Sequence, residues 1–226
     1  MSMLAAPCGN DPSWSKDVLR ATLASAAAII SLLCDWVPSD GNAKPVSYWR
    51  VELPQTFLAR LTGRGRNLAH LEPVIIACPA KAPQNQFTIN VRYSKHCFTV
   101  AFDPRRHKPK WMIMDGKQAR AFDEERFELS KLLAAMIAAL PQADVNQTHE
   151  RNYVYTIPTS RPDGRRYQMF FRIGRAKSGT PYDLELFVES AYLCPTADNK
   201  RLPYKIRFSV LAYKVSTGRP VRFQPR

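Results

Sequence analysis

Cysteine and histidine are scarce in this chain, and neither residue is grouped. The 5 cysteines are widely spaced, odd in number and never form a Cys-x-x-Cys pair. This argues against a disulfide framework and against a zinc site, because both need cysteines in closely spaced sets. The 4 histidines also lack the spacing of metal ligands. We therefore expect no metal and no other cofactor, and reduced, mostly buried thiols typical of a cytoplasmic protein.

Long apolar runs and several enzyme motifs are missing as well. The apolar run Ala21–Cys34 has 14 residues, which is too short to cross a bilayer and begins too late for a signal sequence. The chain has no glycine-rich phosphate loop followed by Lys-Ser/Thr and no Gly-x-Ser-x-Gly elbow. We therefore expect a soluble cytoplasmic protein without a membrane partner.

What the chain does contain is a large excess of positive charge. Its 33 lysines and arginines outnumber 19 aspartates and glutamates, which gives a formal charge of +14. Residues 61–120 carry +8 and residues 149–226 carry +9, whereas residues 1–60 are neutral and residues 121–148 carry −3. Such a surplus attracts polyanions, and contacts to phosphates are the general affinity term in nucleic-acid binding. The same charge is also typical of a surface that only maintains solubility.

Apolar residues with helical spacing predict two long helices. The first covers about residues 15–36. The second covers residues 123–140, with Asp123 as its N-cap. A short helix is expected over residues 55–61, after Pro54. These helices leave most of the chain for β structure.

Alternating apolar and polar residues predict two β regions. A hairpin of residues 87–93 and 96–102 comes first, with residues 111–114 as a third strand. An antiparallel meander of about four strands comes last, at residues 152–157, 165–173, 182–193 and 204–215. The predicted fold is α+β, with an N-terminal helix, a central hairpin and amphipathic helix, and this C-terminal sheet. We expect one compact domain over residues 1–226, divided into subdomains 1–145 and 146–226.

One face of the C-terminal sheet collects arginines and carboxylates. Metal-independent RNA cleavage needs a base, positive charge at the phosphate and an acid. In this hypothesis Glu189 removes the 2′-hydroxyl proton and His149 protonates the leaving oxygen, while Arg172 and Arg207 stabilise the phosphorane. The more ordinary interpretation is that opposite charges on neighbouring strands form ion pairs that stabilise the sheet. Whether the protein is an enzyme stays open.

Three basic segments are candidates for contacts with a phosphate backbone. In the first, prolines are expected to hold the loop extended while a tryptophan offers a stacking face. The second alternates arginine with glycine, and the third flanks a turn at Asp163-Gly164. Charge runs of this kind are also typical of solvated loops. The residues are Arg105, Arg106, Lys108, Lys110 and Trp111 in the first segment, Arg64 and Arg66 in the second, and Arg161, Arg165 and Arg166 in the third.

The C-terminal part resembles a group of bacterial proteins labelled stationary-phase growth adaptation protein, which are found on integrative mobile elements. The resemblance is carried by Phe187–Tyr192, Ile206–Phe208 and Gly218–Val221. It implies a bacterial cytoplasmic protein of the accessory genome and supplies no mechanism. A helix before a basic antiparallel sheet is also similar to barnase-like ribonucleases, an analogy of fold that does not establish function.

These observations predict a nucleic-acid-binding protein, with RNA favoured over DNA. Metal-independent ribonuclease activity is the sharper version of this prediction. The alternative is a non-enzymatic adaptor or inhibitor that places a basic face on an acidic protein partner.

Overall fold

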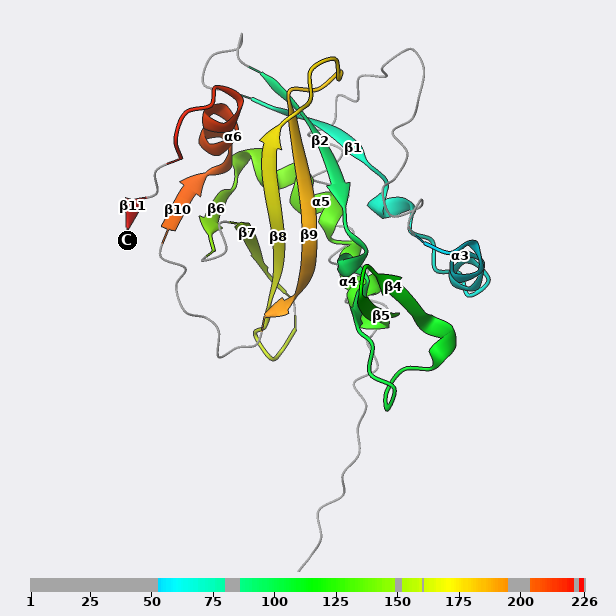
Figure 1. Cartoon of the computed structure of the whole chain (residues 1–226). Helices are drawn as coiled ribbons and strands as arrows, with labels where there is room; N and C mark the ends of the chain where they lie inside the picture. Colours follow the sequence, from blue (N-terminus) through cyan, green and yellow to red (C-terminus); the bar gives the residue numbers. More distant parts are fainter. Residues whose placement is uncertain are drawn as a thin grey trace, which may run out of the picture. The chain divides into compact units, whose positions relative to one another are not determined.

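The computed structural model describes residues 53–79, 86–148, 152–159, 161–194, 204–221 and 224–225. All of them belong to one compact unit that begins at Pro38. Two β-sheets and several short helices make up the described part, which confirms the predicted α+β class (Figure 1). The predicted helix over residues 15–36 lies outside the described residues. The finer division at residue 145 stays a prediction.

The larger sheet has eight strands within the described part of the chain. All neighbouring strands are antiparallel except β2 and β9, which run parallel. Three predicted strands, β7, β8 and β9, are adjacent and antiparallel as expected, and other strands extend the sheet on both sides. In spatial order the strands are β1 (Val74–Cys78), β2 (Phe87–Tyr93), β9 (Leu184–Cys194), β8 (Arg166–Arg175), β7 (Tyr153–Pro158), β6 (Asp144–Gln147), β10 (Tyr204–Arg207) and β11 (Gln224–Pro225).

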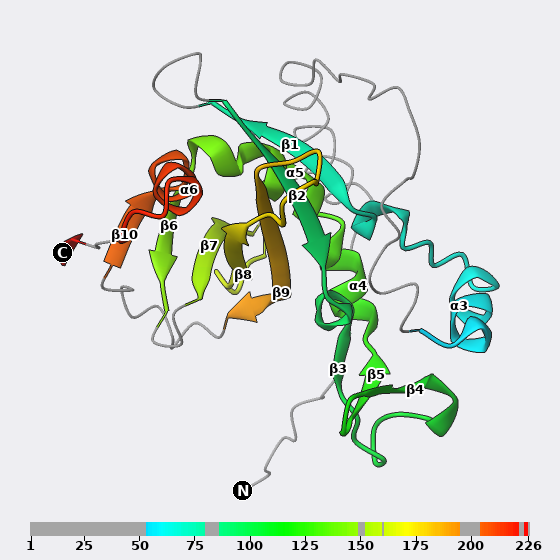
Figure 2. The same cartoon turned by 45° about the horizontal axis from the view of Figure 1, so that its top comes forward.

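One face of the large sheet packs into the core. Leu184, Leu186 and Val188 alternate along β9 with less buried residues, and all three are buried. Helices α4 (Glu124–Ser130) and α5 (Leu133–Ala139) contribute to the same apolar cluster, and Figure 2 shows α4 close to β9. The core therefore lies between this sheet face and the helices.

The predicted helix over residues 123–140 is interrupted. Its start is confirmed, because the Asp123 carboxylate accepts a hydrogen bond from the backbone N–H of Arg126 at 2.8 Å. At the break between α4 and α5, the backbone N–H groups of Lys131 and Leu132 bond to carbonyls three residues earlier. This tighter turn ends one helix and starts the next, so the amphipathic pattern survives without a continuous α-helix.

The last predicted strand, residues 204–215, is a short strand followed by a helix. β10 is followed directly by α6 (Phe208–Ser216). Alternation holds as far as Phe208, but Phe208, Leu211 and Ala212 also have helical spacing, and all three are buried. A helix gives these side chains one common buried stripe against β8, where the Phe208 and Phe171 rings lie 6.0 Å apart.

The predicted hairpin of residues 87–93 and 96–102 does not form. The Ser94 hydroxyl accepts a hydrogen bond from the backbone N–H two residues later and so caps a 3-10 helix, η3 (Lys95–Cys97). The chain then leaves the large sheet and enters β3 (Thr99–Ala101) in a second sheet. β2 pairs instead with β1 and β9. Both of its edges are thereby hydrogen-bonded within the large sheet.

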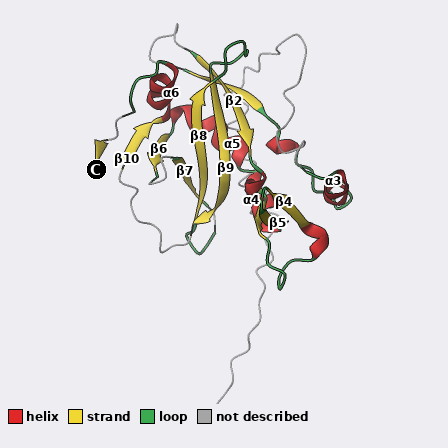
Figure 3. Cartoon of the chain, viewed as in Figure 1, coloured by secondary structure: helices red, strands yellow, loops and turns green. Residues whose placement is uncertain are grey.

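The smaller sheet has three antiparallel strands, β3, β5 (Gln118–Phe122) and β4 (Met112–Asp115), in that order (Figure 2). Figure 3 shows the strands of the structure in yellow, with β4 and β5 labelled. The predicted strand at residues 111–114 corresponds to β4, and β5 was not predicted. Helix α3 (Gln55–Thr62) confirms the predicted short helix. The other short helices within the described residues are η1 (Ala69–Leu71), η4 (Pro109–Trp111) and η5 (Leu140–Gln142).

Candidate nucleic-acid interface

Two of the predicted catalytic residues meet on the large sheet. Glu189 on β9 forms an ion pair with Arg172 on β8, beside an irregularity in the pairing of the two strands. The Asn152 amide donates a hydrogen bond to Glu189 Oε2 at 2.5 Å. The Glu189 side chain is only 18% exposed. Its carboxylate is therefore held by two partners, Arg172 and Asn152.

The other two predicted catalytic residues are not brought to this pair. Arg207 lies on β10, which three strands separate from β9, and its guanidinium lies 3.4 Å from Asp144 Oδ1. His149 lies outside the described residues. Elsewhere on the sheet, Arg92 pairs with Glu185 at 2.8 Å. These contacts favour the interpretation that the charges pair for stability, and the catalytic role stays a prediction.

The basic residues around the β7–β8 turn are also engaged with carboxylates. Arg161 pairs with Glu125 of α4 at 2.6 Å, and Arg165 pairs with Asp163 at 2.7 Å. Arg166, at the start of β8, is exposed. This third segment therefore offers a ligand less uncompensated charge than its sequence suggested.

The first two basic segments meet at one pocket, which sequence reasoning did not foresee. The pocket has a volume of about 300 Å³. It combines five arginines and lysines with a single carboxylate. The convergence depends on the fold, because α3 and the loop before β4 are far apart in sequence. The lining residues are Leu61, Arg64, Arg66, Arg106, His107, Lys108, Lys110, Trp111, Phe122 and Glu124.

The arginine–glycine segment is the end of α3. The backbone N–H of Arg66 bonds to Leu61 O at 2.9 Å, and that of Gly65 bonds to Thr62 O at 2.8 Å. Together these two bonds form a Schellman motif, which needs a left-handed residue, and Gly65 has φ 71°. The glycine thus serves to reverse the chain. The turn places Arg64 and Arg66 at the pocket.

The loop that carries the other cations is folded by Asp103, so the predicted extended conformation is wrong. Asp103 Oδ1 accepts a hydrogen bond from the Arg105 N–H at 2.9 Å, and its carbonyl accepts from the N–H groups of Arg106 and His107. His107 Nδ1 in turn accepts from the Asp103 N–H at 2.9 Å. This Asx turn outweighs the stiffening effect of the prolines.

Trp111 forms the aromatic wall of the pocket. Its ring lies edge-on to Phe57, with centroids 6.1 Å apart, and 5.9 Å from the ring of Phe122. The Arg64 guanidinium lies over the same ring, 5.0 Å from its centroid. The indole is therefore held by the core, and Arg64 covers the ring that was expected to offer a stacking face.

Some cations of the pocket form an ion pair with a carboxylate and others do not. Arg66 pairs with Glu124, at the start of α4, at 2.6 Å. The side chains of Arg106, Lys108 and Lys110 have no carboxylate within ion-pair distance among the residues that the structure describes. These three exposed groups on one loop are therefore the main source of attraction for an anion.

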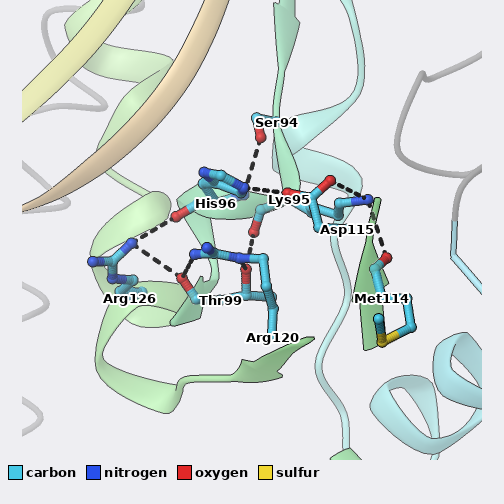
Figure 4. Close-up of polar contacts among 8 residues, drawn as sticks. All are labelled: Ser94, Lys95, His96, Thr99, Met114, Asp115, Arg120 and Arg126. Atoms are coloured by element: carbon cyan, nitrogen blue, oxygen red, sulfur yellow. Dashed lines mark hydrogen bonds and ion pairs between the residues drawn. The ribbon is translucent and has the colours of Figure 1, made fainter. Parts of the chain in front are cut away.

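A polar cluster secures the β4–β5 hairpin that follows this loop (Figure 4). The Asp115 carboxylate, at the end of β4, lies 3.0 Å from Lys95 Nζ and 2.5 Å from His96 Nε2. Burial raises the pKa of Asp115, but hydrogen bonds from His96 and Lys95 outweigh it and hold this pKa below its ordinary value. The Lys95 side chain is only 6% exposed. Asp115 therefore ties η3 to the hairpin through a largely buried charge.

Two arginines complete this cluster around Thr99. Arg120 donates to Thr99 Oγ1 and to its carbonyl oxygen, both at 2.9 Å. Arg126 donates to the carbonyls of Thr99 and His96, both at 3.0 Å. Strands β3 and β5 and helix α4 are thereby linked by charged hydrogen bonds. The frame behind the pocket is consequently fixed on several sides.

Comparison with known proteins places this frame within a family. The model of the YjaZ family matches residues 55–216, which include every residue of the pocket. The chain belongs to the YjaZ family. A relative in this family, Protein YjaZ of Escherichia coli (strain K12), is 30% identical over 129 residues, which are 55% of this chain and 68% of that protein. No solved structure matches the chain significantly.

The YjaZ match overturns the resemblance drawn from the C-terminal residues. Neither the family model nor the Escherichia coli relative indicates a group of stationary-phase growth adaptation proteins or a mobile-element origin, so that assignment is wrong. The short segments that suggested it are too brief to define a family. The predicted bacterial origin is supported by the same matches.

Three further findings concern membrane helices, metal ligands and cysteines. None of the helices that the structure describes is both long and apolar enough to cross a membrane. Within the same residues, no three His, Cys, Asp or Glu side chains are grouped so that they could hold a metal ion. Cys78, Cys97 and Cys194 are buried and form no disulfide.

Proposed function

We propose that this YjaZ-family chain binds nucleic acid, with RNA favoured over DNA, through the pocket between α3 and the loop before β4. The observation that carries the proposal is the convergence of two separate basic segments on one concave site. Phosphates would meet Arg106, Lys108 and Lys110, whose charges no described carboxylate neutralises. Release of counterions from the nucleic acid then supplies most of the affinity.

The electrostatics of the site support a polyanion as the ligand. The pocket places five cations against one carboxylate, Glu124. The sheet face and the β7–β8 turn carry comparable numbers of arginines, but most of these form ion pairs. A ligand at the pocket therefore displaces fewer internal pairs than a ligand on the sheet face or at the β7–β8 turn.

Binding to labelled oligonucleotides at low salt tests the proposal. We expect the wild-type protein to bind RNA and, more weakly, DNA of the same sequence. The triple variant Arg106→Gln/Lys108→Gln/Lys110→Gln should lose most of this affinity. A control with the same charge change, Lys177→Gln/Lys214→Gln/Arg219→Gln, should retain it. Equal losses in both variants, or no binding by the wild type, would contradict the proposal.

A protein partner is the second candidate, and the exposed face of β4 favours it. Met112 and Met114 are 43% and 53% exposed on this edge strand, directly after the basic loop. Apolar side chains beside uncompensated cations suit an acidic protein surface. Retention on polyglutamate at low salt, without retention on RNA, would favour this adaptor role.

Ribonuclease activity is the sharper form of the proposal and has its own assay. In this role Glu189, which Arg172 and Asn152 hold in place, would remove the 2′-hydroxyl proton. Labelled RNA is incubated with the protein in the presence of a chelator. Cleavage that is lost in a folded Glu189→Gln variant would support the activity, and intact RNA would contradict it.

A further inference from the structure

We infer that the pocket between α3 and the loop before β4 accepts an unpaired nucleotide, so that the chain prefers single-stranded over double-stranded nucleic acid. The inference rests on the proposed function and specifies its substrate. Its basis is the shape of the site together with the stacked pair of Trp111 and Arg64.

The site is concave and small. A duplex is read by a convex element, a helix or a β-ribbon, that enters one of its grooves. A pocket of about 300 Å³ offers no such element and is at the small end of sites for single small molecules. Only a nucleotide that projects from its strand can enter it. Unpaired bases project in this way, whereas bases in a duplex stay stacked.

The stacked pair supplies a surface for that base. Phe57 and Phe122 hold the indole of Trp111 in place, and the Arg64 guanidinium lies over its ring at 5.0 Å. Arg64 is an exposed residue, so the side of the guanidinium that faces away from Trp111 is open to a ligand. Planar guanidinium groups stack on nucleobases as aromatic rings do. The base would lie on Arg64, which would be enclosed between two rings.

The cations around this pair fit the backbone of the same strand. Lys108 and Lys110 flank Pro109 on the loop that ends at Trp111, and a hydrogen bond of 2.6 Å from Arg60 to Lys110 O fixes this loop to α3. The backbone that carries a base on Arg64 therefore passes close to both lysines. Arg66 is held by Glu124, which also lines the pocket, and supports the site without needing a phosphate of its own.

Three probes at one salt concentration test the inference. They are a single-stranded RNA, the duplex of the same sequence and inorganic polyphosphate, which has charge without bases. We expect the single strand to bind at least about tenfold more tightly than the duplex. Equal affinity for the two would overturn the inference while leaving nucleic-acid binding intact. If the protein binds neither the single strand nor the duplex, the proposed function is overturned as well.

Arg64→Lys separates stacking from charge. The lysine keeps the positive charge and loses the planar group, so affinity for the single strand should fall about tenfold while affinity for polyphosphate stays unchanged. Arg219→Lys is the matched control, because Arg219 stacks in the same way on Tyr213, at 5.3 Å, outside the pocket. Wild-type affinity of Arg64→Lys for the single strand would contradict the stacking role.

Discussion

The salt dependence of binding can be worked out from the ion pairs at the pocket. Arg66 already neutralises Glu124, which leaves about four cations for phosphates: Arg64, Arg106, Lys108 and Lys110. For a single strand, the logarithm of affinity falls with the logarithm of salt concentration with a slope of about −0.7 per contact, or about −2.8 in all. A fourfold increase in KCl, from about 50 to about 200 mM, should therefore weaken binding about fiftyfold.

Removal of the three loop cations should flatten this dependence. In Arg106→Gln/Lys108→Gln/Lys110→Gln about one contact remains, so the same increase in KCl should weaken binding only about threefold. Fluorescence anisotropy of a labelled RNA, titrated at several KCl concentrations, measures both slopes. The control variant Lys177→Gln/Lys214→Gln/Arg219→Gln has the same net charge as the variant that lacks the three loop cations. If its slope flattens as much as that of the pocket variant, overall charge rather than the pocket governs binding, and the reasoning is refuted.

Three further predictions concern stability. Gly65→Ala forces a side chain into a left-handed conformation, which should cost about 1–2 kcal/mol in thermal denaturation and weaken RNA binding; an unchanged melting temperature would contradict the cap. Asp115→Asn leaves Lys95 buried without its carboxylate, and chemical denaturation should show a loss of about 1–3 kcal/mol, with no loss if the pair is dispensable. Burial and the charge of Lys131 lower the pKa of His70, so the unfolded chain takes up this proton first as pH falls below about 6.5. The free energy of unfolding should decline from about pH 7 to about pH 5, and less steeply in His70→Gln than in the wild type. Equal declines in the two proteins would contradict the role assigned to His70.

Local sequence patterns correctly predicted those elements whose structure depends mainly on the residues within them. Asp123 followed by two glutamates favours a helix start, and the structure confirms the predicted N-cap. Alternation fits the first half of β9, where Leu184, Leu186 and Val188 are buried, but it is interrupted at Glu189, where the pairing with β8 is irregular. In contrast, Phe208 fits both an alternating and a helical pattern. Only packing against Phe171 selects the helix there, and no local signal reports that contact.

The site was predicted in parts but not as a whole. The sequence picked out Arg64, Arg106 and Trp111 as candidates, and the structure shows them at one pocket. Their convergence depends on the small sheet, whose strand β5 had not been predicted. Glu124 lies in the first turn of α4, and its pairing with Arg66 was not foreseen. Contacts between segments that lie far apart in sequence carry no signature in either segment alone.

The parallel pairing of β2 with β9 has a consequence for the synthesis of the chain. The Thr88 and Asp183 side chains, 95 residues apart, already bond at the start of this pairing. One edge of β2 therefore stays open while the ribosome makes everything up to β9, and the cluster that includes Ile89 and Val91 cannot close before then. During that interval the nascent chain exposes an apolar strand edge of the kind that chaperones protect. Fragments that stop short of β9 should aggregate rather than fold.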